Sequence, residues 1–209
     1  MLAAIFPPPS ASIITSPTIV QQVQPLGQLV TYRMPFAKAN ISVIVRYGAV
    51  NICRIGALHT AEGIVEAGVD LQQITVDSIR FDEASNTYFI QLPSPQITSC
   101  SLDPMNVVQY HTFGEVPVTC PADMDEIRRM ASYVAVNEFR DTALDIGILE
   151  EAEVQARQVI QGFVSSLTNA SVEISFAAND EAAILPASCR PQVPGEWVYS
   201  EISGDWRKP

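Results

Sequence analysis

The stretch ILEEAEVQARQVIQGFVSSL, at residues 148–167, has the clearest periodicity in the chain and decides its fold class. Its apolar residues recur at steps of three and four positions, which places their side chains on one face of a helix. The residues of this stripe are Ile148, Ala152, Ala156, Val159, Phe163 and Leu167. The pattern predicts an amphipathic helix whose stripe packs into the core, with a groove for a partner as the alternative use of the same face.

A second helix is expected immediately upstream, ending before Gly147. Asp123 supplies a capping side chain, and Glu126 follows three residues later, which is the spacing of a capping box. Apolar residues then recur at helical steps, namely Met124, Ile127, Ala131, Val134 and Ala135. Downstream of the stripe, Asn169 is the expected C-cap, and residues 171–176 are the expected final strand.

Residues 28–112 are mostly β-type segments separated by short turns. The predicted strands are 29–34, 41–45, 56–69, 74–81, 87–92, 97–102 and 107–112. The alternation slips at Asp77 and Ser78, which predicts a bulge in the 74–92 hairpin. Consecutive strands with short turns form antiparallel sheets. We therefore expect an α+β protein: a curved antiparallel β-sheet of about six to seven strands, with two consecutive C-terminal helices packed on one face and a final strand.

Composition divides the chain into three expected regions. Residues 1–17 form a stalk rich in proline and serine, residues 18–177 form a single α+β domain, and residues 178–209 form an irregular Pro-rich tail. Trp197, Tyr199 and Trp206 are expected to pin the tail to the domain. Residues 1–6 have two interpretations at this point, a plain apolar start or the last turn of a membrane helix.

The composition is typical of a soluble acidic domain. Twelve Lys and Arg residues face 23 Asp and Glu residues, for a net charge of −11. Binding to phosphate requires clustered basic residues, so we expect no nucleic-acid partner and no direct binding to an anionic membrane surface. No run reaches the roughly 18 apolar residues of a membrane-spanning helix.

The four cysteines are Cys53, Cys100, Cys120 and Cys189, and no two of them form a C-x-x-C pair. An even number without metal-type or redox-type spacing favours disulfides, which persist in an oxidising compartment. The alternative is four reduced, buried cysteines that act as small hydrophobic residues. The pairing that we predict joins Cys100 to Cys120 and Cys53 to Cys189.

The sequence contains no complete catalytic, cofactor or metal motif. Its two histidines are His59 and His111, no G-x-S-x-G elbow exposes a serine, and neither a Walker loop nor a G-x-G-x-x-G fingerprint is present. Cys100 with His111 is the best nucleophile–base pair that composition offers. Cys100, His111 and Cys120 are spaced too widely for a zinc knuckle. We therefore assign no catalytic residue, no cofactor and no metal ligand.

Acidic residues gather between positions 123 and 153, where nine carboxylates face three arginines. The carboxylates are Asp123, Asp125, Glu126, Glu138, Asp141, Asp145, Glu150, Glu151 and Glu153. Acid–base catalysis and calcium binding both use paired carboxylates, but the D-x-D-x-D loop spacing is absent. We interpret the group as a solvated helix face with several carboxylates at helix N-termini.

Five segments together resemble a known bacterial family, and they are residues 18–31, 63–71, 92–97, 147–156 and 172–176. In order and spacing they look like the uncharacterised family catalogued as domain of unknown function 4230 (DUF4230), over residues 18–177. The resemblance implies an N-terminal membrane helix followed by one extracytoplasmic domain, with no assigned activity. Residues 1–17 are then a stalk that follows a truncated membrane anchor, because the sequence given lacks that helix.

The positions that match the family pattern best have structural interpretations, and they are Gly68, Asp70, Leu71, Pro93 and Pro95. Gly68 would permit a bulge or a close backbone approach, and Asp70 could hydrogen-bond its own turn. The tail with Cys189, Trp197 and Trp206 lies outside the resemblance.

Three functions remain open from the sequence. The first is a membrane-anchored, extracytoplasmic interaction domain without catalysis, whose partner is unknown. The second is a binding module for a small apolar or lipid-like ligand held between sheet and helices. The third is a hydrolase that uses an unrecognised carboxylate or the pair Cys100 and His111.

Overall fold

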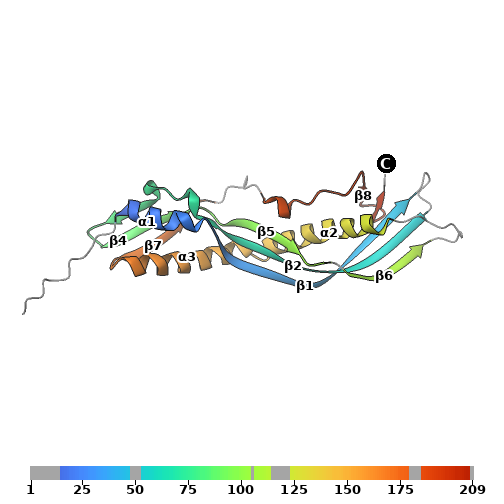
Figure 1. Ribbon diagram of the computed structural model, residues 1–209, viewed down its shortest axis with the longest axis horizontal. Helices are drawn as coiled ribbons and strands as arrows, with labels where there is room; N and C mark the ends of the chain where they lie inside the picture. Colours follow the sequence, from blue (N-terminus) through green and yellow to red (C-terminus); the bar gives the residue numbers. More distant parts are fainter. Residues whose placement is uncertain (1–14, 48–52, 105, 114–122, 179–184, 208–209) are drawn as a thin grey trace, which may run out of the picture. The chain divides into compact units, whose positions relative to one another are not determined.

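The computed structural model describes residues 15–47, 53–104, 106–113, 123–178 and 185–207 (Figure 1). It confirms an α+β protein in which two consecutive helices follow most of the strands and precede a further strand. Contacts divide the chain into two compact units. The first unit takes Met1–Tyr32, Gly68–Gln96 and Leu149–Ala183, and the second takes Arg33–Ala67, Ile97–Ile148 and Ile184–Pro209.

The first unit contains a three-stranded sheet with the order β3–β4–β7. Strand β3 (Ile79–Asp82) pairs antiparallel with β4 (Thr87–Leu92), and β4 pairs parallel with β7 (Ser171–Phe176). Helix α1 (Ser16–Val23) has Pro17 in its first turn, where the missing N–H is tolerated. Helix α3 (Ile148–Leu167) leads into β7, as the periodicity predicts.

The core of the first unit lies where α1, α3 and this sheet bury their apolar faces. Helix α3 contributes Ala156, Ile160 and Val164, all at most 1% exposed. The predicted stripe was therefore wrong in its second half, because Val159 is 48% exposed and Phe163 is only partly buried. The buried row continues at steps of four from Ile148, which keeps it on one face of the helix.

The second unit is organised by two long strands, β1 (Gln28–Tyr47) and β2 (Cys53–Asp70), which also extend into the first unit. The strand order is β5–β2–β1–β9–β8, and β6 also pairs with β2. The other strands are β5 (Gln96–Leu102), β6 (Asn106–Phe113), β8 (Val198–Ser200) and β9 (Asp205–Arg207). Helix α2 (Met124–Asp145) belongs to this unit and starts at the predicted cap, Asp123.

Strand β1 is continuous where the sequence predicted two strands. Pro35, the expected break, is exposed within β1. Strand β9 pairs with β1 only at Val45 and Arg46. In the described part of the sheet, Pro35 therefore lies on a stretch of β1 that has β2 as its one neighbour, where a proline is tolerated.

The expectation of one antiparallel sheet was also wrong. The strands form two sheets, and the pairs β4–β7 and β1–β9 are parallel. Between β4 and β7 the chain runs through β5, β6, α2 and α3, and such a long connection makes a parallel pair possible. The predicted bulge at Asp77 and Ser78 is instead a 3₁₀ turn, Val76–Ser78, whose Ser78 Oγ accepts from the Thr75 N–H at 3.2 Å.

The segment predicted to be an irregular tail carries an ordered hairpin. Strands β8 and β9 pair antiparallel, with Tyr199 opposite Trp206, and β9 continues the sheet beside β1. Gly204, at φ +64°, closes the turn between them. Among the helices that the structure describes, none is both long and apolar enough to cross a membrane. The predicted stalk lies mostly in residues 1–14, outside the described part of the chain.

Candidate functional site

A disulfide between Cys100 and Cys189 attaches the C-terminal segment to strand β5. Their Cα atoms are 5.0 Å apart, and both side chains are buried. The backbone N–H of Cys100 donates to Ser188 Oγ at 3.2 Å, and Arg140 of α2 donates to the Cys189 carbonyl oxygen at 2.9 Å. Residues 187–189 are therefore fixed to both β5 and α2.

The predicted disulfide pairing was wrong. Cys100 bonds to Cys189, across 89 positions of sequence, and not to the nearer Cys120. Sequence proximity misleads because partners are chosen by the distance between Cα atoms in the fold. Cys120 and the side chain of Cys53 lie outside the described residues.

Beyond the disulfide, the β8–β9 hairpin is held by a buried carboxylate. Asp205 is fully buried and accepts hydrogen bonds from Arg46 of β1, from Ser203 at 2.7 Å and from Arg207 at 3.2 Å. Burial by itself would raise the pKa of this carboxyl. The hydrogen bonds from Arg46, Ser203 and Arg207 outweigh it and lower the pKa to about 2.

We predict that Asp205→Asn lowers the free energy of unfolding at neutral pH by about 3 kcal/mol, because it leaves two arginines beside an uncharged buried group. The native carboxyl has its folded pKa below the ordinary value of 3.8, so its contribution is present above pH 3.8 and is lost as the pH falls toward about 2. Urea unfolding across this range is expected to show a smaller loss of stability in the variant.

The control for this prediction is Glu201→Gln, in the same turn, where the side chain is exposed. His59 also destabilises the acidified protein, but it is common to all three proteins and cancels in the comparison. Equal pH dependence of the Asp205 variant and the native protein between pH 3.8 and about 2 would show that the carboxylate does not hold the hairpin.

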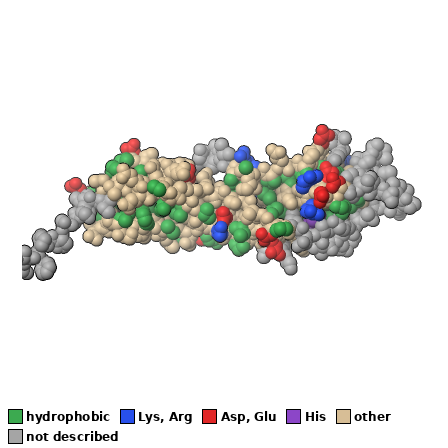
Figure 2. Space-filling view, viewed as in Figure 1, with side chains coloured by type: hydrophobic (Ala, Val, Ile, Leu, Met, Phe, Trp, Pro, Cys, Tyr) green, Lys and Arg blue, Asp and Glu red, His purple; other side chains and the backbone are tan. Residues whose placement is uncertain are grey.

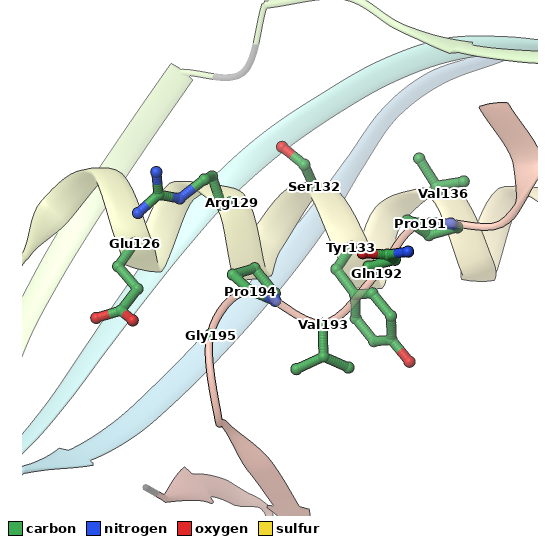
Figure 3. A pocket seen from close by; sticks show the side chains of 10 residues that line it. All are labelled: Glu126, Arg129, Ser132, Tyr133, Val136, Pro191, Gln192, Val193, Pro194 and Gly195. Atoms are coloured by element: carbon green, nitrogen blue, oxygen red, sulfur yellow. The ribbon is translucent and has the colours of Figure 1, made fainter. Parts of the chain in front are cut away.

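The first hollow of the second unit lies between α2 and residues 191–195, which we call the strap. It has a volume of about 630 Å³. Figure 3 shows the strap running along α2, with the side chains of Val193 and Tyr133 projecting to the same side. Gly195, at φ +64°, lies close to the carboxylate of Glu126, since an added Cβ would come within 3.3 Å of Glu126 Oε1. The hollow is thus walled by a helix on one side and by the strap on the other.

The second hollow, of about 510 Å³, shares Tyr133 with the first and is walled by β1, α2 and the β8–β9 hairpin. The ring of Trp206 contacts two tyrosine rings there. The ring centroids of Tyr199 and Trp206 are 5.1 Å apart, and those of Tyr133 and Trp206 are 5.8 Å apart in an edge-to-face arrangement. Asn137 and Asp141 of α2 add polar atoms to the lining.

In the second hollow, the charges of Arg140 and Asp141 neutralise each other. Arg140 Nε donates to Asp141 Oδ1 at 2.7 Å, while another nitrogen of the same guanidinium donates to the Cys189 carbonyl oxygen. Asn137 Nδ2 donates to the Tyr133 carbonyl oxygen at 2.9 Å. This arrangement offers an aromatic surface beside fixed hydrogen-bonding groups, and the described residues that line the two hollows include no cysteine or histidine.

The catalytic pair that composition suggested does not form. Cys100 is bonded to Cys189, so it has no free thiolate. His59 is fully buried on β2, and among the described residues neither of its ring nitrogens has a hydrogen-bond partner. Desolvation, and secondarily the charge of Arg128, lower the pKa of His59. His111 pairs through its backbone with Gly56, and its side chain is outside the part of the chain that is described.

The residues of the family pattern lie in the first unit and have packing or turn contacts. Gly68 passes so close to β1 that a Cβ there would come 2.0 Å from the Leu29 carbonyl oxygen. Asp70 Oδ1 accepts from the Gln72 N–H at 3.0 Å. Leu71 is fully buried, and its N–H donates to the Gly27 carbonyl oxygen at 3.0 Å. Pro93 and Pro95 lie between β4 and β5.

Several acidic residues of the 123–153 group cap or pair with neighbours. Asp123 accepts from two N–H groups at the start of α2, at 3.0 and 3.1 Å. Asp125 pairs with Arg128 at 3.3 Å, and Glu153 pairs with Arg157 at 2.9 Å. On the face in Figure 2, some red side chains lie beside blue ones, and others stand apart from them. Over the described ranges, no three His, Cys, Asp or Glu residues gather as a metal site would require.

Sequence reasoning noted the aromatic residues of the tail but missed that they line a hollow. The available signal was the alternation around Trp197-Val198-Tyr199, followed by a turn with Gly204 and then Asp205-Trp206-Arg207. What no local pattern indicates is the parallel pairing of this hairpin with β1, which is more than 150 positions away.

Comparison with known proteins identifies one family and no individual relative. The family model described as "Protein of unknown function (DUF4230)" matches residues 21–174. No curated protein and no solved structure matches the chain. The matched range includes α2 but ends before the strap and the hairpin. Both hollows are therefore walled on one side by residues that the family pattern does not cover.

Proposed function

Because the chain belongs to the DUF4230 family, which is uncharacterised, we propose a function from its geometry: an extracytoplasmic, membrane-anchored binding protein without catalytic activity. The observation that carries this proposal is the placement of the Cys100–Cys189 bridge. The bridge fixes residues 187–189 directly before the strap, and the strap and hairpin wall both hollows.

The bridge links the proposed binding surface to a compartment. Disulfides form and persist in oxidising environments and are rare in the cytosol. If the walls of the hollows depend on a bridge, the surface is complete only where that bridge is oxidised. This supports a location outside the cytoplasm, and an N-terminal membrane anchor fits the family pattern described above.

The side chains best placed to act chemically are already engaged or enclosed, which supports binding rather than catalysis. Cys100 is oxidised, and Asp205 is neutralised by Arg46 and Arg207. The side chain of His59 is fully buried, so a substrate does not reach it. The hydrolase interpretation loses its best nucleophile for this reason.

The structure supports the binding of a ligand in the two open hollows better than it supports a protein that carries an apolar ligand in its core. In the first unit, the buried row of α3 is occupied by core residues of α1, β4 and β7. The two hollows of the second unit include charged and amide side chains in their linings. A hydrocarbon in either would desolvate those groups without replacing their hydrogen bonds.

The location is tested on cells that produce the native protein. We predict that spheroplasts treated with protease lose the domain from the membrane fraction without lysis, because the domain faces outward. A cytoplasmic membrane protein serves as the protected control. Protection of the domain until the spheroplasts are lysed would contradict the extracytoplasmic location.

A further inference from the structure

The second hollow combines an exposed aromatic ring with a fixed, neutral set of hydrogen-bonding groups. Tyr199 is 49% exposed, whereas Trp206 beside it is 8% exposed. The two residues face each other in the hairpin register, and Trp206 is also opposite Val45 of β1. Tyr199 is therefore held in place by a buried ring that is itself held by the sheet, so a ligand that stacks on it loses little additional side-chain freedom.

The polar groups are equally constrained. Asp141 keeps 58% of its side chain exposed while it accepts from Arg140, so the carboxylate stays available as a hydrogen-bond acceptor. The amide nitrogen of Asn137 is used by the Tyr133 carbonyl oxygen, which leaves the amide oxygen as a second acceptor. Ser42, exposed on β1, adds a hydroxyl to the lining.

The charges exclude several classes of ligand. An anion would need a cationic donor, but Arg140 already donates to Asp141 and to the Cys189 carbonyl oxygen. A metal ion would need several carboxylates or imidazoles, whereas Asp141 is the one acidic residue among the described residues of this lining. A purely apolar ligand would strip water from Asp141 and Asn137. The remaining class is an uncharged molecule with both an apolar face and many hydroxyl groups.

We propose that the second hollow binds a neutral carbohydrate, with a sugar ring stacked on Tyr199 and its hydroxyls donating to Asp141 and Asn137. A sugar ring presents C–H groups on its faces and hydroxyls at its edge, which matches an aromatic surface flanked by acceptors. The volume of about 510 Å³ lies in the usual range for small-molecule sites. This inference rests on the proposed function, which places the domain where glycans occur.

An extended peptide is the competing ligand class, and the hairpin supports it less. Peptides that add to a sheet edge need a run of unpaired backbone groups. Strand β8 offers three residues, Val198–Ser200, which is a short edge. Stacking on one ring beside fixed acceptors requires no such run.

The experiment is a printed array of neutral oligosaccharides built from glucose, galactose, mannose and N-acetylglucosamine, probed with the oxidised protein. The tightest binder is then titrated by calorimetry. We expect Tyr199→Ala and Asp141→Asn each to raise Kd by about tenfold or more. The first variant removes the stacking surface, and the second removes the charged hydrogen-bond acceptor. Their matched controls are Val198→Ala and Glu138→Gln, which change exposed residues of β8 and α2 outside the lining. We expect these to change Kd by less than about twofold.

Three results would overturn the carbohydrate site. They are an array without binding, a Kd that neither lining variant changes, and saturable binding of an unstructured peptide library at Tyr199 in place of any sugar. Unchanged thermal unfolding of each variant establishes that a loss of binding is not a loss of folding. If the domain faces outward but binds no sugar, only the carbohydrate site is rejected. If the domain is protected inside spheroplasts, the proposed function is rejected.

Discussion

Removal of the Cys100–Cys189 bridge is expected to lower the free energy of unfolding by about 4 kcal/mol. The bridge closes a loop across 89 positions, and in the chain-entropy account a loop of that size contributes about 4–5 kcal/mol. The variant to make is Cys100→Ala with Cys189→Ala, because both side chains are buried and serine would bury two hydroxyls. Urea unfolding of the oxidised native protein and of the variant measures the difference.

The matched control for the bridge is Ser188→Ala. It keeps the disulfide and removes the hydrogen bond from the Cys100 N–H, together with the weak contact of Ser188 Oγ to Cys189 Sγ at 3.9 Å, so we expect a loss of about 1 kcal/mol. Limited digestion with a glutamate-specific protease gives a local measure, since Glu196 follows the strap directly and is exposed. Faster cleavage there in the double variant would follow from a released strap. A loss of stability no larger than that of the control would mean that the strap is fixed by its other contacts.

Gly68→Ala is expected to cost about 3 kcal/mol or more, or to prevent folding. An added Cβ would lie 2.0 Å from the Leu29 carbonyl oxygen and 2.8 Å from the Val30 Cα. Both are backbone atoms, so the clash is relieved only by separating β2 from β1. Chemical denaturation of the purified protein, or the soluble fraction when no protein can be purified, measures the effect.

Gly162→Ala is the matched control for this prediction. Nothing lies within 4 Å of a Cβ at Gly162, which sits inside α3. Alanine is favoured over glycine in a helix interior by about 1 kcal/mol, so this variant is expected to be more stable than the native protein. A Gly68→Ala protein as stable as the native one would contradict the close approach of the two strands.

The elements set by local pattern could be predicted from the sequence. Helix α3 has the predicted bounds, and α2 begins beside Asp123 because the capping side chain acts within one turn. The pattern failed where pairing over long distances decides the structure. Pro35 does not end β1, because in the described part of the sheet β1 has a neighbouring strand on one side only at that point and the missing N–H of proline is tolerated. The parallel pairs β4–β7 and β1–β9 leave no signature in the local sequence.

The candidate site was less predictable than the fold. Tyr199 and Trp206 were recognisable as anchors of the tail, but their role as walls of a hollow depends on the pairing of β9 with β1 and on the bridge at Cys189. The disulfide partners were misassigned because sequence distance says little about which strand a distant turn reaches. The family pattern gave no help there, since it ends at residue 174.

The measurement that tests the central claim most directly is disulfide mapping of the native protein. Cells are lysed in the presence of an alkylating reagent, and the protein is digested without reductant and examined by mass spectrometry. The account predicts a linked pair of peptides that contain Cys100 and Cys189, with neither cysteine alkylated. Complete alkylation of both cysteines, or a peptide that links Cys100 to Cys120, would contradict a bridge-dependent binding surface outside the cytoplasm.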